Sequence, residues 1–374
     1  MFLGSLHRRK FVLEGQSFDK SLQARLGTGR ERTIYHPFSF KFEGITTTVN
    51  KGTNTPTIPA IQSQYSIQIL ETLVAHADRW RTACLSADGD GLKKSLTKAK
   101  HRFGQLHSLQ IRTFWPWERY DMPSDLFLDV PNLTRVHTTD FYQLHWSSIT
   151  VLHINSQRHG TTDKFFAKLD KMTCLEELEI KGFPLRDYTG PIELSSLEIF
   201  SADHCFLVSL IKAPALEILY LTGPLAGGVP HATTLLRGVN RLQTLSFDVH
   251  NSGYARIIDC TPELDHLILS PDITSELVSD LRSVLQSLPS HSTARSLRRI
   301  SISKLRPIVS NIDELLTVIK SWKKREFPKL RSVSVHVNDS REEDMTAAVA
   351  HLMGIDASDR GFEIDVSFTP FVFC

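Results

Sequence analysis

The sequence predicts an α/β fold made of repeated units, with a curved parallel sheet on the inside and helices and loops on the outside. A short apolar pattern returns along the chain while the residues between its apolar positions change, as in "LEILYL" at 216–221 and "LDHLIL" at 264–269. Most of its occurrences are separated by about 20 to 29 residues, which is enough for one strand and a returning connection. Several of the intervals also have the apolar spacing of an amphipathic helix.

The pattern has apolar residues at its first, fourth and sixth positions. Side chains alternate between the two faces of a strand, so the fourth and sixth residues point together into a core while their neighbours point outward. The intervals range from 16 residues, between the starts at 133 and 149, to 33 residues, between those at 297 and 330. We therefore expect an irregular leucine-rich-repeat solenoid, in which each unit adds one layer to a continuous core. The pattern begins at residues 106, 133, 149, 175, 197, 216, 242, 264, 297 and 330, with weaker members at 37 and 80.

Three segments are expected along the chain. Residues 1–42 hold the first, atypical repeat turns, with a helical stripe that ends at Leu26 and alternating phenylalanines from Phe38. Residues 43–63 are rich in Thr, Asn, Gly and Pro and predict an exposed loop. Residues 64–374 are expected to form a single continuous repeat domain, because a repeat array is not limited by the size at which one globular core stops growing.

Helices are expected in the intervals between pattern members, on the outer side of the sheet. The interval after the member at 264 places leucines at helical spacing on one face. In the next interval, Asn311 is the expected N-cap and Glu314 follows it by three residues, as in a capping box. The expected helices cover residues 67–77, 91–103, 273–288, 311–322 and 344–354.

Charge, cysteine content and hydropathy limit the classes of partner. The 43 Lys and Arg residues nearly balance the 41 Asp and Glu residues, so neither nucleic acid nor an anionic membrane is favoured as a partner. The five cysteines are far apart and form no CxxC pair, so neither a zinc site nor a disulfide framework is expected. The opening residues lack the apolar core of a signal peptide, and no apolar stretch approaches the length of a membrane span. We therefore expect a cytoplasmic or nuclear protein.

Sequence signatures of enzymes are not found. The segment "GTGRER" at 27–32 lacks the third glycine of a dinucleotide-binding loop, and no GxxxxGK[ST], HExxH or GxSxG motif occurs. We therefore expect no catalytic, cofactor-binding or metal-binding residues, and a non-enzymatic function. An enzyme with an unrecognised site in a helix-rich α/β fold is the less favoured alternative.

The residues between the apolar positions are the candidates for binding a protein partner. Their charge changes from acidic in the turn at 175 to basic in the turns at 297 and 330, which suits a partner with its own charge gradient. The alternative is that these are only solvated strand residues. Aromatic residues around Pro116 could also anchor a partner, and packing over a loose turn is an equal alternative for them. The candidate partner-binding residues are Glu177, Glu179, Tyr220, His266, Arg298, Arg299, Arg331, Trp115 and Trp117.

The chain also resembles a known family through six segments. They are "FLGSLH" at 2–7, "HPFSFKF" at 36–42, "HADRWRTACL" at 76–85, "HWSSITVLHI" at 145–154, "APALEILYL" at 213–221 and "TPELDHLIL" at 261–269. In these segments, almost the whole chain resembles the leucine-rich-repeat region of fungal F-box proteins, especially the divergent sets of mushroom-forming fungi. Such proteins are similar to substrate receptors of SCF-type ubiquitin ligases, in which the F-box binds the Skp adaptor and the repeats hold the substrate. The resemblance therefore implies a role in substrate recognition.

The chain departs from this family in two ways. In the family, a segment like "FLGSLH" follows the F-box, whereas here it begins at Phe2. The Skp adaptor is therefore an expected partner only if an F-box exists upstream, and an F-box-less scaffold or decoy with no ligase link is the alternative. Regular leucine-rich repeats also carry an asparagine three residues after the third apolar position, which only Asn338 matches, with Cys205 as a permitted substitute. We therefore expect an uneven solenoid.

Overall fold

The chain divides into two compact units, residues 1–175 and 176–374. Of the segments expected from the sequence, the helix at 344–354, most of residues 1–42 and most of the loop at 43–63 lie outside the part that the structure describes. The computed structural model describes residues 37–43, 68–114, 125–139, 143–155, 162–182, 191–222, 229–248, 254–270, 278–305, 315, 317–322, 325–339 and 362–370.

The described strands of the first unit are parallel and pair in chain order. They are β1 (Phe38–Glu43), β2 (Trp80–Asp88), β3 (Ser108–Phe114), β4 (Arg135–Thr138) and β5 (Val151–Asn155). The helices and 3₁₀ helices are η1 (Ala77–Arg79), α3 (Gly89–Thr97), η2 (Trp146–Ser148) and α4 (Thr162–Leu169), and residues 68–74 are also helical. The helix expected at 91–103 is shorter than predicted, because the backbone turns after Thr97 and His101 has a φ of 71°, which a helix cannot continue through.

The second unit repeats the alternation of strand and helix more regularly. Its strands are β6 (Glu177–Lys181), β8 (Ile199–Ala202), β10 (Ile218–Leu221), β11 (Thr244–Asp248), β12 (His266–Ser270), β13 (Arg299–Leu305), β14 (Ser332–Asp339) and β15 (Glu363–Pro370). Two short strands, β7 (Ile192–Glu193) and β9 (Ile211–Lys212), form a separate small sheet. The helices and 3₁₀ helices are α5 (Cys205–Ser209), α6 (Val229–Arg237), α7 (Tyr254–Asp259), α8 (Val278–Ser287), η4 (Leu288–Ser290) and η5 (Ser292–Arg295). Residues 315 and 317–321 are helical, as expected from the sequence.

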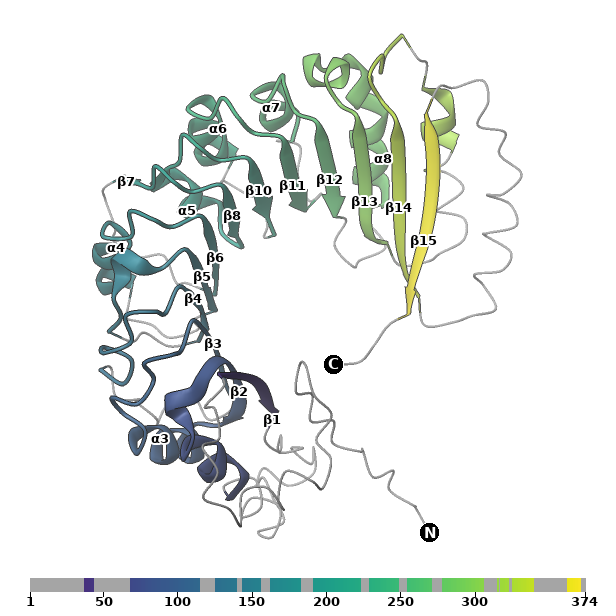
Figure 1. Ribbon diagram of the computed structural model, residues 1–374. Coiled ribbons are helices and arrows are strands. Elements are labelled where there is room, and N and C mark those ends of the chain that lie inside the picture. The colour runs from purple at the N-terminus through teal and green to yellow at the C-terminus, as the bar shows by residue number, and fades with distance from the viewer. Residues whose placement is uncertain are drawn as a thin grey trace, which may run out of the picture. The chain divides into compact units, whose positions relative to one another are not determined.

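The large sheet follows the order of the chain. Its 13 parallel strands are arranged as β1-β2-β3-β4-β5-β6-β8-β10-β11-β12-β13-β14-β15 (Figure 1). Parallel neighbours need a connection that returns to the starting end of the strand, and helices occupy many of these connections. The predicted α/β class and its large parallel sheet are therefore confirmed.

The apolar pattern of the sequence forms the core of this sheet. In all ten members that begin between 106 and 330, the first, fourth and sixth residues have relative exposures of 6% or less. Leu219 of β10 pairs with Phe200 of β8 on one side and with Leu245 of β11 on the other. Each of these is the fourth residue of its member, so equivalent positions stack in one layer. The spacing therefore recurs because each strand must supply the same buried positions.

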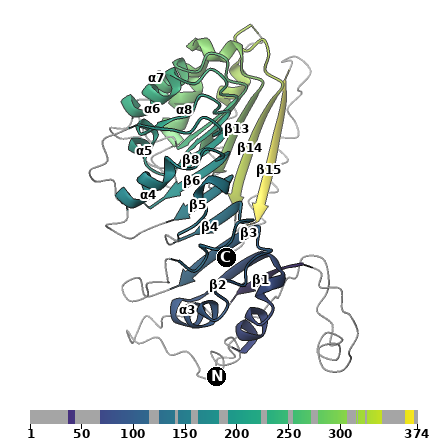
Figure 2. The same ribbon diagram turned by 60° about the vertical axis from the view of Figure 1, so that its left-hand side comes forward.

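In the second unit, helices α5 to α8 lie along one face of the strands (Figures 1 and 2). The helix expected at 273–288 is present in its described part as α8, and its residues Leu281 and Leu285 are fully buried. The next helical segment packs beside it, since the indole Nε1 of Trp322 donates a hydrogen bond to the Leu285 carbonyl at 3.2 Å. We call the other face of these strands, which points away from α5 to α8, the open face.

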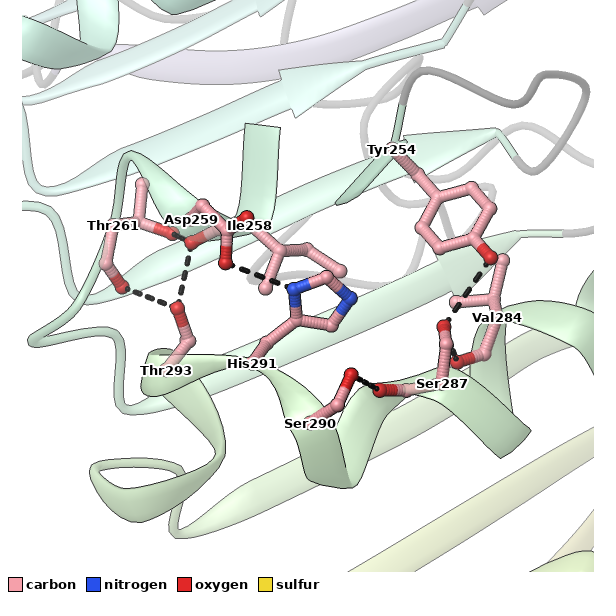
Figure 3. Close-up of polar contacts among 9 residues, drawn as sticks. All are labelled: Tyr254, Ile258, Asp259, Thr261, Val284, Ser287, Ser290, His291 and Thr293. Carbon is pink, nitrogen blue, oxygen red and sulfur yellow. Dashed lines mark hydrogen bonds and ion pairs between the residues drawn. The ribbon is translucent and has the colours of Figure 1, made fainter. Parts of the chain in front are cut away.

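Hydroxyl groups join successive connections behind the sheet (Figure 3). The Thr293 hydroxyl, which is fully buried, lies 2.6 Å from the carbonyl oxygen of Ile258 and 3.2 Å from that of Thr261. Nearby, Nδ1 of His291 lies 2.8 Å from Oδ1 of Asp259. The Ile258 carbonyl also accepts from the Thr261 backbone N–H and the Thr261 carbonyl from the Leu264 backbone N–H, so the side chains of Thr293 and His291 add further connections. They tie α7 to the segment that follows α8.

Candidate functional site: the open face of the second unit

The open face is built from the third and fifth residues of each pattern member. Along β6, β8, β10 and β12 these residues are half-buried and alternate with fully buried ones. Parallel pairing places residues of equal position side by side on neighbouring strands, so the face consists of two rows. The third-position row contains Glu177, Ile199, Ile218, Thr244, His266, Arg299, Ser332 and Glu363. The fifth-position row contains Glu179, Ser201, Tyr220, Ser246, Ile268, Ser301, Ser334 and Asp365.

A third row, the entry row, lies where the strands begin. Each residue after the first donates its backbone N–H to the carbonyl of the preceding residue of the row at 2.8 to 3.0 Å, so the residues are held one strand spacing apart. That spacing is about 4.8 Å. The row starts with three glutamates, passes through one neutral amide and one aspartate, and ends with two arginines. Its members are Glu176, Glu198, Glu217, Gln243, Asp265, Arg298 and Arg331.

The acidic end of the face covers β6, β8 and β10. Glu176 and Glu198 of the entry row are exposed, and Glu217 is half-buried. Glu177 and Glu179 of β6 add two more carboxylates, of which Glu179 forms an ion pair with Lys181. Five carboxylates therefore gather on this end of the face, which favours a negative local field.

The basic end covers β13 and β14. Asp265 lies between two guanidinium groups, with Oδ1 3.3 Å from Nε of Arg298 and Oδ2 3.3 Å from Nη2 of Arg299. Arg331 on the next strand is exposed. Asp265 offsets part of this charge, and β15 follows with the exposed carboxylates Glu363 and Asp365, so the positive region is confined to β13 and β14. Because the arginines are exposed, their ion pairs contribute little to folding stability and leave the guanidinium groups accessible to a partner.

Apolar side chains lie beside the glutamates of β8 and β10, and the strands that follow are hydroxyl-rich. Ile199 and Ile218 are register partners, and Tyr220 follows on the same strand. Closer to the basic end, Nε2 of His266 lies 2.8 Å from Oγ of Ser301, and that hydroxyl lies 2.8 Å from Oγ of Ser334. A histidine beside a serine is the first step toward a nucleophile with its base, but catalysis also needs a group that orients the histidine. Among the described residues, His266 has no such hydrogen bond to Nδ1.

His266 should titrate below the ordinary range of histidine. Burial lowers its pKa from 6.5, the nearby Arg299 guanidinium lowers the pKa further, and the Asp265 carboxylate opposes both. We expect the imidazole signals of His266 in an NMR titration to shift with a midpoint below 6.5. Arg299→Ala should move that midpoint up and Asp265→Asn should move it down. A midpoint above 6.5 in the unaltered chain would contradict this account of the site.

The lowered pKa of His266 also makes the stability of the folded chain depend on pH. Since the folded pKa lies below the unfolded value, the unfolded chain binds the proton more tightly. The contribution of neutral His266 to stability is therefore complete above the unfolded pKa and is lost as the pH falls below it.

The structure places the predicted candidate residues as follows. Glu177, His266 and Arg299 lie in the third-position row, and Glu179 and Tyr220 lie in the fifth-position row. Arg298 and Arg331 lie in the entry row instead of on the strand face itself. Trp115 and Trp117 lie outside the described residues.

Other residues of the face were not singled out by their sequence. They include Glu198, Ile199, Ile218, Ser301, Ser334, Glu363 and Asp365. Their positions in the pattern, second, third or fifth, are the signal that would have found them. Charge or an aromatic ring identified only some residues of each row as candidates for partner binding, whereas all residues of the row form the surface.

One polar contact at the far end of the strands takes the place of an asparagine that regular leucine-rich repeats have. Oδ2 of Asp203 accepts a hydrogen bond from the backbone N–H of Gly182 at 2.6 Å, and Gly182 has a φ of 71°. This conformation suits glycine and not residues with a side chain. Cys205, which the sequence matched to the asparagine position, instead begins α5. Asp203 therefore links one turn to the next two residues earlier than expected.

The strands of the first unit carry their own polar row. Sγ of Cys84 donates to Oε1 of Gln110 at 3.2 Å, and the rings of His137 and His153 lie 4.0 Å apart between centroids. Within the described ranges, no group of three or more His, Cys, Asp or Glu side chains is arranged to hold a metal ion. No described helix has the length and apolar character needed to cross a membrane.

Comparison of the chain with models of protein families and with curated proteins found no match. Any inference about function therefore rests on the geometry and chemistry of the open face.

Proposed function

We propose that the chain is a non-enzymatic protein-interaction module, which binds a protein partner on the open face of residues 176–374. The observation that carries this proposal is the order of side chains on the face: carboxylates over β6 to β10, isoleucines and a tyrosine beside them, and arginines over β13 and β14. Protein interfaces combine apolar and aromatic anchors with charges arranged to complement those of the partner. The half-buried isoleucines and Tyr220 supply the apolar part of such an interface.

The finer identity of the module is an irregular leucine-rich-repeat solenoid that resembles the substrate-recognition part of an SCF-type ubiquitin ligase. Three observations support the repeat: the buried first, fourth and sixth positions, the stacking of equivalent residues, and the chain order of the strands. The ligase role is supported by the resemblance of the six sequence segments to fungal F-box proteins. An F-box-less scaffold would bind its partner on the same face without recruiting a ligase.

A photo-crosslinking experiment tests whether the open face binds protein. A benzophenone amino acid replaces Tyr220 in one preparation and Arg237, an exposed residue of α6, in the other. Irradiated in extract of the cells that express the chain, the first preparation should give a discrete crosslinked protein and the second should not. Equal products from both positions, or none from position 220, would contradict the proposal.

The ligase link has its own measurement. Calorimetry of the purified chain with the Skp adaptor, beside a version extended by any upstream coding sequence, should give binding if either form carries an adaptor surface. Binding by neither form would assign the chain to the scaffold alternative.

A further inference from the structure

We infer that the partner of the open face is an extended protein segment in which basic residues, an aliphatic anchor and acidic residues follow one another in that order. This inference rests on the proposed function, because it names the chemistry of the partner that the face would bind. It is carried by three features within residues 176–374: the acidic end, the apolar residues on two of its strands, and the exposed arginines.

The direction of the charge change determines how the segment lies. Charge varies from strand to strand along the entry row, from Glu198 on the β8 side to Arg298 on the β13 side. Along a single strand the change is smaller, since β6 carries Glu177 and Glu179 before Lys181, which is paired with Glu179, and β13 begins with Arg299. A segment that matches both ends must therefore cross the strands and not run alongside one of them.

The spacing of the strands sets the length of the segment. Four strand steps separate β8 from β13 in the sheet order, which is about 19 Å at about 4.8 Å per step. An extended chain covers about 3.4 Å per residue, so about six residues separate the basic group from the acidic group of the partner. A helical segment of that length would cover less than half the distance.

The anchor fits the half-buried apolar group of β8 and β10. Ile199 and Ile218 are neighbours in the third-position row, and Tyr220 extends the group toward the fifth-position row. They lie closer to the acidic end, so the aliphatic residues of the partner should directly follow its basic residues. Tyrosine is among the residues that most often carry binding energy once a partner shields them from water.

Nucleic acid is a poor match for this surface. A phosphate chain that contacted Arg298 and Arg299 would have to pass the carboxylates of the acidic end or leave the face. Repulsion at that end would remove the counterion-release gain that drives such binding. A segment with both signs of charge gains at both ends.

Two synthetic peptides of identical composition test the inference. The block peptide is KKLLSGSEE, in which the charges are grouped, and the alternating peptide is KELLSGSKE, in which they are mixed. Fluorescence anisotropy with the full chain should show the block peptide binding about tenfold more tightly at low salt, because only its charges match both ends of the face. The difference should shrink at high salt, where charges on the surface are screened.

A matched pair of variants localises the effect. Glu198→Lys changes the acidic end, whereas Glu193→Lys makes the same change in charge at an exposed residue of β7. We expect Glu198→Lys to remove the preference for the block peptide and Glu193→Lys to keep it. Both variants should retain the circular dichroism spectrum and the thermal unfolding midpoint of the unaltered chain, because both side chains are exposed.

The results separate this inference from the proposed function. Equal affinity for the two peptides, or an equal effect of the two variants, would overturn the inference. If position 220 still captured a protein in the crosslinking experiment, the proposed function would stand and only the chemistry of the partner would be wrong. Failure of both experiments would overturn both.

Discussion

Replacing Trp80 with alanine should lower the free energy of unfolding of the chain by about 3 to 5 kcal/mol, the usual cost of removing a large buried aromatic side chain. Trp80 is fully buried, and its ring contacts those of Phe40 and Phe103 at centroid distances of 4.7 and 5.4 Å. Its Nε1 also donates a hydrogen bond to the Leu73 carbonyl at 3.1 Å. Truncation would leave a cavity and remove this hydrogen bond from the Leu73 carbonyl, which keeps the one that it accepts from the His76 backbone N–H.

The measurement is urea denaturation followed by circular dichroism, with hydrogen exchange to locate the change. Because each repeat unit packs mainly on its neighbours, we expect protection to fall most in residues 37–43 and 68–114. Arg81→Ala, at the exposed neighbouring position, is the control and should change stability by less than about 0.5 kcal/mol. A loss below about 1 kcal/mol for Trp80→Ala would show that the weak pattern member at 80 does not form part of the core.

Most of the sheet could be predicted because one rule applies at every strand. A residue at the fourth position of the pattern has the same surroundings in each turn, so Leu178, Leu219 and Leu267 are buried for one reason. Even the atypical member "WRTACL" follows the rule, with Trp80, Ala83 and Leu85 fully buried. Alternation along a strand is local, and a sequence pattern can therefore report it.

The shorter helices could not be predicted in the same way. α5 and α7 have five and six residues, fewer than two turns, so no apolar spacing has room to repeat. The small sheet of β7 and β9 depends on pairing between residues that are 19 apart in the chain, such as Ile192 and Ile211. Strands of two residues are too short to show a sequence pattern that predicts this pairing. Asp203 was missed for a related reason, since its contact with Gly182 depends on a turn in the preceding repeat.

For the candidate site, the sequence predicted which residues are exposed but not how they pair. The acidic and basic turns are visible in the sequence, and alternation places Glu177, Glu179 and Tyr220 on the open face. That Asp265 would lie between Arg298 and Arg299 depends on register between β12 and β13. The contact between His266 and Ser301 depends on the same register.

Two neighbouring residues of β12 provide the sharpest test of the two faces of the sheet. Leu267 is fully buried on the core side, where it pairs with Leu245 and Ile300, and Ile268 is half-buried on the open face. Leu267→Ala should cost about 2 to 5 kcal/mol of unfolding free energy, as a cavity in a packed core does. Ile268→Ala should cost about 1 kcal/mol, because only part of that side chain is removed from water.

The comparison is informative because the two changes are chemically alike and adjacent in the chain. Both changes remove the same number of carbon atoms and leave alanine on the same strand, so the difference in urea midpoint chiefly reports the face on which each side chain lies. If the pairing of β12 were displaced by one residue, all its side chains would exchange faces and the order of the two costs would invert. An Ile268→Ala variant that is as unstable as Leu267→Ala would therefore contradict the register of β12, and with it the rows from which the open face is built.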